Sequence, residues 1–378
     1  MIYLDNSATT RVCQEAAQAA YSCMTGEFYN PSALYPPSMH VEKKMEECRE
    51  LIARQVHAPR DARVVFTSGG TEADNLAILG GCARFREGQV LYSAGEHPAV
   101  RETCLSMRNV KCGEIPLQRN GQVNLEKLEQ MLTADTRMIC VMQVNNETGA
   151  VMQLARIAGL RDRICPDALL HVDGVQGFMR LPVDMTGWGI DSYALSGHKI
   201  HAPKGIGALV MGPRLRPAPR QIGGGQERNL RSGTENTPGI MALAEAIKAY
   251  PADNRLRETK CALYRAIRDR IPAATVNGPE PWGDDSAPHI LNVSLPPVRS
   301  ETILHALEQD EIYIGLGSAC SSHQQKISRV LSSMGIGRNI AESALRFSLC
   351  PDNTEDEMKI VAEKIAAYYD EYKQFVRR

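Results

Sequence analysis

The sequence predicts an α/β protein in which a large domain with a mostly parallel sheet precedes a smaller α+β domain. Up to about residue 250, short uninterrupted apolar runs alternate with longer helical patterns. Strands of this kind are typical of a sheet that helices cover on both faces. Beyond that point the pattern changes, and 378 residues are more than one ordinary core accommodates. We therefore expect two domains.

The first predicted domain begins with helices and continues mainly with strands. Apolar side chains at alternating four- and three-residue steps predict a helix over residues 38–56. The run at residues 63–67 predicts a strand, which a glycine turn joins to a helix over residues 72–79. Further strands are expected at residues 90–93, 138–144, 169–173, 192–196 and 206–211.

The second predicted domain consists of helices that flank strands. The helical patterns cover residues 254–270 and 354–374, and the strands lie at residues 289–295 and around 345–347. Between the first helix and the first strand, the sequence Pro-Trp-Gly-Asp-Asp at residues 281–285 predicts an exposed loop. This mixture indicates an α+β arrangement.

Composition and charge exclude several classes of function. Apolar residues make up 43% and charged residues 23%, and 43 basic against 44 acidic side chains give a formal net charge of −1. We therefore expect no direct nucleic-acid partner. No apolar run approaches the roughly 18 residues of a membrane span, so we expect no membrane association. The first five residues turn polar too early for a signal peptide.

The cysteines predict a reducing environment. Eleven are present, an odd number, and none forms a Cys-x-x-Cys pair. In a chain of this length, such a pattern indicates free thiols, not a disulfide framework or a structural zinc site. We therefore expect a cytoplasmic location and no resident metal. Most of the cysteines are expected to be small buried hydrophobic residues.

A glycine turn after the strand at residues 63–67 is a candidate phosphate site. Residues 67–72, Thr-Ser-Gly-Gly-Thr-Glu, run from the strand through the turn into a helix. Such a turn directs backbone amides and the positive end of the helix toward an anion, and the Thr71 hydroxyl adds a donor beside Gly70. A tight turn without a ligand is the alternative. The Gly-Lys-Ser/Thr ending of a P-loop is missing.

A lysine that directly follows a predicted strand is the second candidate. It ends the motif Ser196-Gly197-His198-Lys199. A lysine can form a Schiff base with an aldehyde cofactor, and Ser196 and His198 can bind the phosphate of that cofactor. A lone lysine is usually a solvated surface charge, but Lys199 follows an apolar strand and lies between two histidines, His198 and His201.

Two further polar residues follow predicted strands. Asp173 ends the strand at residues 169–173, and the carboxyl ends of such strands border the crevice in which open α/β sheets bind ligands. Its carboxylate can pair with a protonated pyridine nitrogen, or it can cap a helix. His97, which follows Glu96, can stack on a flat ring or relay protons. The alternative for His97 is a capped core histidine.

A cysteine and an arginine complete the set. Cys320 lies among glycines and serines at residues 315–322, which predicts an exposed, mobile loop that suits a thiol moving between two places. Arg346 lies between apolar neighbours on a predicted strand. A buried guanidinium matches a carboxylate, either of a substrate or of a structural ion pair. Taken in order along the chain, these features indicate one pyridoxal-phosphate site with an amino-acid substrate.

These motifs resemble the NifS/IscS-like cysteine desulfurases, which are fold-type I pyridoxal-phosphate enzymes of the class V aminotransferase group. The resemblance extends from residues 3–10 to the region of Arg346. Its most specific motifs lie at residues 196–199, 203–207, 231–236 and 317–320. The family implies an aspartate-aminotransferase-like fold with a seven-stranded, mostly parallel sheet. It also implies a large cofactor-binding domain over residues 15–252, a small domain over 253–378 that carries the cysteine loop, and an N-terminal segment, 1–14, associated with the small domain.

The resemblance also implies a role for each matching residue. Lys199 carries the cofactor, Cys320 is the nucleophile that accepts sulfur, and His97 both stacks on the cofactor ring and takes part in catalysis. The other cofactor contacts implied are Gly70, Thr71, Asn146, Asp173, Gln176, Ser196 and His198, with Thr234 contributed by the second subunit of a homodimer. The substrate contacts implied are Asn30, Asn146 and Arg346.

The activity implied is the removal of sulfur from L-cysteine, which leaves alanine and a persulfide on Cys320. The persulfide would pass to a sulfur-acceptor protein, either a scaffold for iron–sulfur cluster assembly or an enzyme of tRNA or cofactor thiolation. The stretch from Cys320 to Arg346 resembles the long-loop branch of the family. The chain ends soon after residues 368–372, without the longer tail with which IscS-type members bind a scaffold. The acceptor therefore stays open.

Three alternatives stay open at this point. A selenocysteine lyase or another class V enzyme, such as a transaminase, would keep Lys199 and Asp173 without depending on Cys320. A non-catalytic sulfur carrier on the same fold is a different class, and the presence of Lys199 argues against it. The sequence also leaves open whether Cys320 is a transient ligand of an iron–sulfur cluster.

Overall fold

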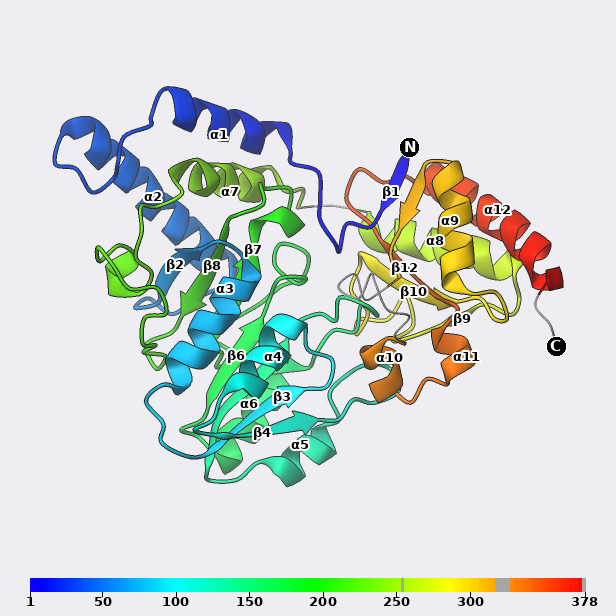
Figure 1. Cartoon of the computed structure of the whole chain (residues 1–378), viewed down its shortest axis with the longest axis horizontal. Helices are drawn as coiled ribbons and strands as arrows, with labels where there is room; N and C mark the ends of the chain where they lie inside the picture. Colours follow the sequence, from blue (N-terminus) through cyan, green and yellow to red (C-terminus); the bar gives the residue numbers. More distant parts are fainter. Residues whose placement is uncertain (253–254, 317–326, 376–378) are drawn as a thin grey trace.

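The computed structural model describes residues 1–252, 255–316 and 327–375. The elements form a larger group around one sheet and a smaller group beside it, on the left and right of Figure 1. The large sheet has the strand order β2-β8-β7-β6-β5-β3-β4. Its strands are β2 (Arg63–Thr67), β3 (Gln89–Ser93), β4 (Lys111–Ile115), β5 (Thr136–Met142), β6 (Leu169–Asp173), β7 (Ser192–Ser196) and β8 (Gly207–Met211).

The strands of this sheet are mostly parallel, as predicted. From β7 through β6, β5 and β3 to β4, every neighbouring pair is parallel. Only β8 runs against its neighbours, β2 and β7. In such a sheet, ligands bind at the carboxyl ends of the parallel strands. The α/β fold class with a seven-stranded sheet is therefore confirmed.

Helices cover both faces of the large sheet. One core cluster joins one set of alternate strand residues to α2, α5, α6 and α7, and another joins the opposite set to α3 and α4. The period of two along a strand explains this division. The helices of this group are α1 (Gln14–Thr25), α2 (Pro36–Gln55), α3 (Gly70–Asn75), α4 (Pro98–Ser106), α5 (Leu125–Met131), α6 (Leu154–Ile164) and α7 (Thr237–Ala249).

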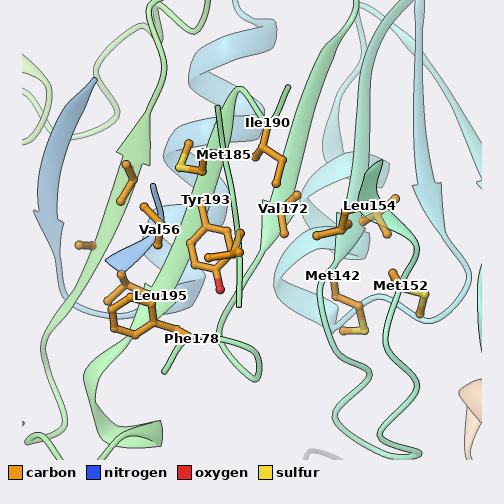
Figure 2. Packing of buried hydrophobic residues seen from close by; sticks show 14 of the residues in the cluster. Val56, Met142, Met152, Leu154, Val172, Phe178, Met185, Ile190, Tyr193 and Leu195 are labelled. Carbon is orange, nitrogen blue, oxygen red and sulfur yellow. The ribbon is translucent and has the colours of Figure 1, made fainter. Parts of the chain in front are cut away.

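Figure 2 shows part of the larger core cluster. Val172 on β6 and Tyr193 on β7 are inaccessible to solvent. The Tyr193 hydroxyl donates to Oε1 of Gln143 at 2.6 Å, so its polar end is satisfied inside the core. This packing fixes the strands whose carboxyl ends carry Asp173 and Ser196.

The smaller group contains two short sheets and helices. Its strands are β1 (Ile2–Leu4), β9 (Thr275–Val276), β10 (Ile290–Ser294), β11 (Ile312–Ile314) and β12 (Ala344–Ser348). Its helices are α8 (Leu256–Arg270), α9 (Ser300–Gln309), α10 (Arg329–Ser333), α11 (Arg338–Ala341) and α12 (Glu355–Tyr372). Strand β12 pairs antiparallel with β10, and β9 pairs with the other edge of β10.

The N-terminal strand belongs spatially to this smaller group (Figure 1). It pairs in parallel with β11, and Leu4 is buried in the same apolar cluster as Phe347. Helix α10 behaves differently, because Val330 and Leu331 pack into the core cluster of the large sheet. The segment that begins at residue 327 therefore packs against the group of elements around the large sheet before the chain forms β12.

Several elements differ from the expectation. The sequence analysis missed β4, whose residues are mostly exposed or half-buried, because an edge strand does not need an apolar run. The helix predicted over residues 72–79 begins at Gly70 and continues as a π-helical segment, Leu76–Gly80. Among the described residues, no helix has the length and apolar character that crossing a membrane requires.

Candidate active site

A cavity of about 700 Å³ lies at the carboxyl ends of the parallel strands. The structure brings most of the predicted site residues to its walls, although they are spread over the chain. These are Gly70, Thr71, His97, Asn146, Asp173, Gln176, Ser196, His198, Lys199 and Arg346. The position agrees with the general rule for ligand sites of open α/β sheets.

Lys199 ends a short 3-10 turn that follows β7. Its Nζ donates to the carbonyl oxygen of Ala8 at 2.8 Å and also to that of Ser7. Burial, followed by the nearby charge of Arg346, lowers the pKa of the Lys199 ammonium to about 8. An amine with this pKa is partly neutral near physiological pH and can act as a nucleophile or base.

Asp173 is the last residue of β6, and only 6% of it is exposed. Its Oδ1 accepts from the backbone N–H of Val175 at 2.9 Å. Burial raises the pKa of the carboxyl, while His97 and Lys199 act in the opposite direction. A buried carboxylate of this kind is stabilised by a cationic partner, such as a protonated ring nitrogen.

Gln176 offers the cavity a hydrogen-bond acceptor. Its Nε2 donates to the carbonyl oxygen of Ser7 at 3.0 Å. Its Oε1 is buried, and within the described part of the chain it has no hydrogen-bond partner. Because a buried polar atom is normally satisfied, this oxygen fits a ligand that donates a hydrogen bond, such as a protonated ring hydroxyl.

The glycine turn forms a close-fitting wall of the cavity. A Cβ atom added to Gly70 would lie 2.6 Å from Cγ2 of Val175, so only glycine fits there. Thr71 and Ser196 line the same cavity. The Nδ1 atom of His198 lies 3.1 Å from the Thr9 hydroxyl, and burial lowers the pKa of this imidazole to about 4. Hydroxyls, a neutral imidazole and backbone amides suit a phosphate group.

The structure confirms the capping role of His97 and places its side chain at the cavity, while its stacking and proton-relay roles stay predictions. His97 is the N-cap of α4, because its Nδ1 accepts from the N–H of Ala99 at 3.1 Å. It is also half-buried and lines the cavity. Burial lowers the pKa of the imidazole, which favours its neutral form. Because Nδ1 accepts the cap hydrogen bond, the neutral ring carries its proton on Nε2.

Arg346 forms the structural ion pair and also lines the cavity, while its substrate contact stays a prediction. It lies on β12 with 2% of its surface exposed, and its Nη2 forms an ion pair with Oδ1 of Asp5 at 2.6 Å. Its Nη1 donates to the carbonyl oxygen of Asn146 at 3.1 Å. Because the side chain also lines the cavity, it places a positive charge where a substrate carboxylate could bind.

Two predicted residues, Asn30 and Thr234, do not line this cavity. Asn30 is exposed in the loop between α1 and α2, where its Oδ1 accepts from the N–H of Ser32 at 2.9 Å. Thr234 is exposed after Gly233 and does not line the cavity. Cys320 lies outside the described residues.

Seven polar residues of the cavity wall were not predicted from the sequence: Ser7, Asp74, Glu96, Arg101, Glu102, Glu147 and Arg329. Two of them carried a usable signal, since Glu96 precedes His97 and Glu147 follows Asn146. Asp74 is buried against His171, with 3.1 Å between Oδ1 and Nε2. Burial, and then the charge of Asp173, raise the pKa of Asp74 well above its usual value.

The donor set of the cavity fits pyridoxal phosphate. Lys199 supplies an amine for the aldehyde, and Asp173 supplies a carboxylate for the ring nitrogen. Gln176 supplies an acceptor for the ring hydroxyl, and the wall near Gly70 and Ser196 supplies donors for the phosphate.

Comparison with protein families gives an independent result. The protein-family model described as aminotransferase class-V matches residues 2–361 of the chain. The match therefore includes both groups of elements and every described residue that lines the cavity.

Named relatives and solved structures are similar over nearly the whole chain. A protein named cysteine desulfurase from Trichormus azollae is 36% identical over 375 residues, which cover 96% of this chain and 91% of the relative. Cysteine desulfurase NifS of Azotobacter vinelandii is 35% identical over 381 residues, with coverage of 96% and 91%. The solved structure of a NifS-like protein from Rickettsia africae has a TM-score of 0.86 and 28% identity, covering 98% of this chain and 99% of that one.

Proposed function

The chain belongs to the class V aminotransferase family, and we propose that it is a pyridoxal-phosphate-dependent cysteine desulfurase. One observation carries the proposal: Lys199, Asp173 and the buried oxygen of Gln176 line a single cavity at the carboxyl ends of the sheet. Arg346 in the same cavity favours an amino-acid substrate, because its guanidinium matches a carboxylate.

The chain's own residues have distinct tasks in this proposal. When bound, the cofactor supplies an electron sink for the α-carbon of the amino acid. Lys199 holds the cofactor and then moves a proton at that α-carbon, a task that suits an amine with a pKa of about 8. Arg346, together with Asn146, receives the substrate and orients it. Asn30, which lies outside the cavity of its own chain, is the third proposed substrate contact.

Cys320 is the proposed sulfur acceptor. Its thiolate attacks the sulfur of the bound cysteine, so that a sulfur–sulfur bond forms and the carbon–sulfur bond breaks. The electron pair of the broken bond goes to the carbon, which takes up a proton to become the methyl group of alanine. The proposed acceptor of the thiol proton is either the bound substrate or His97, whose ring lines the cavity.

We further propose that the enzyme works as a homodimer. Large apolar side chains are exposed together on α1, on α2 and in the loop between them, and Leu34 is 95% exposed. The others in this surface are Tyr21, Met24, Phe28, Tyr35 and Met39. Exposed apolar side chains that are concentrated in one segment favour a protein interface there. Asn30 lies in the same loop, so dimerisation offers a route by which Asn30 and Thr234 complete the site of the partner subunit.

The destination of the sulfur belongs to the same proposal. The persulfide of Cys320 would pass to a sulfur-acceptor protein, either a scaffold for iron–sulfur cluster assembly or a thiolation enzyme. The ten described cysteines are all free, which suits a reducing compartment such as the cytoplasm.

The test is to incubate the protein with L-cysteine, measure alanine and locate the persulfide by mass spectrometry. We expect one alanine for each sulfur transferred, with the first sulfur on Cys320. The variant Cys320→Ser should form alanine on the order of a thousandfold more slowly, while Cys13→Ser, the matched control at a half-exposed thiol outside the cavity, should match the wild type. Persulfide on another cysteine, or full activity of Cys320→Ser, would contradict the assignment.

A further inference from the structure

Arg180 is a buried arginine that contacts the main chain of both Gln176 and Lys199, two of the residues proposed to hold the cofactor. It is 8% exposed and follows the turn after β6. Its Nη2 donates to the carbonyl oxygen of Lys199, and its Nη1 donates to that of Gln176 at 3.4 Å. The buried Tyr250 hydroxyl lies near the guanidinium, which acts to lower the pKa of that hydroxyl against the larger, raising effect of burial. The planar fork of one side chain therefore joins the segment after β6 to the segment after β7.

The backbone is unusual on both sides of this contact. Met179, immediately before Arg180, has a φ of 63°, and His201, shortly after Lys199, has a φ of 66°. Side-chain-bearing residues rarely adopt this left-handed conformation, which persists only where the surroundings enforce it. At His201 the backbone N–H donates to the Thr10 hydroxyl at 2.8 Å. Both segments that Arg180 joins are therefore held in conformations that local preference does not favour.

Arg180 and Arg346 both lie near Lys199, but they differ in whether their positive charge has an acidic partner. Arg346 is paired with Asp5. Among the described residues, no carboxylate lies within ion-pair distance of Arg180, so its positive field reaches Lys199 without a local counter-charge. Burial, Arg346 and Arg180, in that order, lower the pKa of Lys199, whereas Asp5 and Asp173 raise it. The remaining titratable groups that face this lysine are His97 and His198, both with lowered pKa values.

We propose that Arg180 is a positioning residue for Lys199. Its guanidinium fixes the main chain of Lys199 relative to that of Gln176 and places an uncompensated positive charge beside the lysine side chain. The inference rests on the proposed role of Lys199 as the cofactor lysine. Arg180 acts without touching the substrate. It sets the position of the Lys199 amine and the ease with which that amine loses its proton.

The experiment measures how fast the full chain, after removal of its cofactor, captures added pyridoxal phosphate at different pH values. Capture needs the neutral amine, so the rate should rise with pH and level off above a midpoint near 8, the pKa of Lys199. The visible absorbance of the bound cofactor reports the rate, and mass spectrometry after borohydride reduction identifies the modified lysine.

Two substitutions separate the contact from the charge. Arg180→Lys keeps a positive charge but cannot bridge two carbonyl oxygens, so the plateau rate should fall by on the order of tenfold with an unchanged midpoint. Arg180→Gln also removes the charge, so the midpoint should in addition rise by roughly one pH unit. Tyr250→Phe is a mild third variant. It removes one contact of the guanidinium and should lower the plateau rate by about twofold without moving the midpoint.

Arg161→Lys is the matched control. Arg161 is a buried arginine of the same domain, 1% exposed and paired with Asp191 at 3.0 Å, but it does not line the cavity. Loss of this guanidinium should lower thermal stability and leave the capture profile of the folded protein unchanged. A merely structural role of Arg180 would give the same result as this control.

The outcomes distinguish this inference from the proposed function. If Lys199→Ala still forms the same absorbance band, the assignment of Lys199 is wrong and both proposals fail. If the band requires Lys199 while the Arg180 variants reproduce the wild-type rate and midpoint, only the role of Arg180 is wrong. Should both Arg180 variants fail to fold, Tyr250→Phe decides, and a wild-type plateau rate for that variant overturns the inference.

Discussion

His97 is a residue in which a structural and a chemical role coincide. Its Nδ1 caps α4 at 3.1 Å from the N–H of Ala99, and its ring faces the cavity that holds Lys199 and Asp173. The two roles need different atoms, since a cap needs only an acceptor whereas stacking and proton transfer need the imidazole.

A substitution can therefore separate the roles of His97. His97→Asn keeps a good N-cap acceptor but has no imidazole, so the free energy of unfolding should stay within about 0.5 kcal/mol of the wild type. Alanine formation should fall on the order of a hundredfold. Denaturant unfolding and alanine release measure the two effects. His97→Ala, the comparison variant, should lose both activity and about 1 kcal/mol of stability. An active His97→Asn would show that the ring is not used.

At the scale of elements, the loop after β5 links the two domains at the cavity. Glu147 is buried in this loop, and its Oε2 accepts from the Ser328 hydroxyl at 2.5 Å. Its carbonyl oxygen accepts from Nδ2 of Asn292, on β10, at 3.0 Å. Ser328 in turn caps α10, because its Oγ accepts from the N–H of Leu331 at 3.1 Å. The wall that contains Asn146 is therefore tied to α10 and to β10.

Ser328→Ala tests this link. It removes the cap of α10 and leaves a buried carboxylate without its hydroxyl partner, so the free energy of unfolding should fall by about 2 kcal/mol. Because the same wall lines the cavity, kcat/KM for cysteine should fall as well. Ser328→Thr retains the hydroxyl and should restore most of both quantities. Ser333→Ala, the control in the same helix, should change neither, since its hydroxyl bonds only the backbone of Val330. Equal behaviour of the two alanine variants would refute the link.

At the scale of the whole molecule, the open question is how two exposed residues, Asn30 and Thr234, could contribute to a buried site. Neither lines the cavity of its own chain. A dimer built on the apolar surface of α1 and α2 supplies the missing contacts only if each site takes residues from both subunits.

Mixed dimers give a direct test of shared sites. Lys199→Ala and Thr234→Ala subunits are each expected to be defective alone. In a mixed dimer, one site combines an intact Lys199 from one chain with an intact Thr234 from the other, so activity should recover to about half that of a wild-type dimer. The measurement is alanine formation by mixed dimers purified through two different affinity tags. If mixing restores nothing while the dimer forms, Thr234 does not complete the neighbouring site.

The local pattern of the sequence was sufficient for most of the large sheet. Strands were predicted at residues 63–67, 169–173 and 192–196, and these bounds match β2, β6 and β7. A buried strand needs a continuous apolar run, and that requirement is visible in a few neighbouring residues. The edge strand β4 carries no such run, and the apolar runs of β1 and β11 are only three residues long, so these segments become strands only through their partners.

The same distinction between local sequence pattern and tertiary contact applies to the residues of the cavity. Lys199 and Asp173 could be predicted because each directly follows a buried strand, and a strand's carboxyl end determines where the next side chain stands. Three sets of contacts could not be predicted in this way. They are the hydrogen bonds of Lys199 to Ser7 and Ala8, the ion pair of Arg346 with Asp5, and the hydrogen bond of Arg180 to Lys199. Each joins residues far apart in the chain, so chain folding alone decides whether they meet.

The sequence by itself determined the class of fold, the kind of cofactor and most of the predicted residues that line the cavity, because apolar periodicity, short motifs and strand-end chemistry are local properties. The tertiary structure alone decided how reactive those residues are. The lowered pKa of Lys199 comes from burial and from the positive charges of Arg346 and Arg180, which two distant segments bring to it. Electrostatic interactions depend on distance in space, and the order of residues along a chain does not fix that distance.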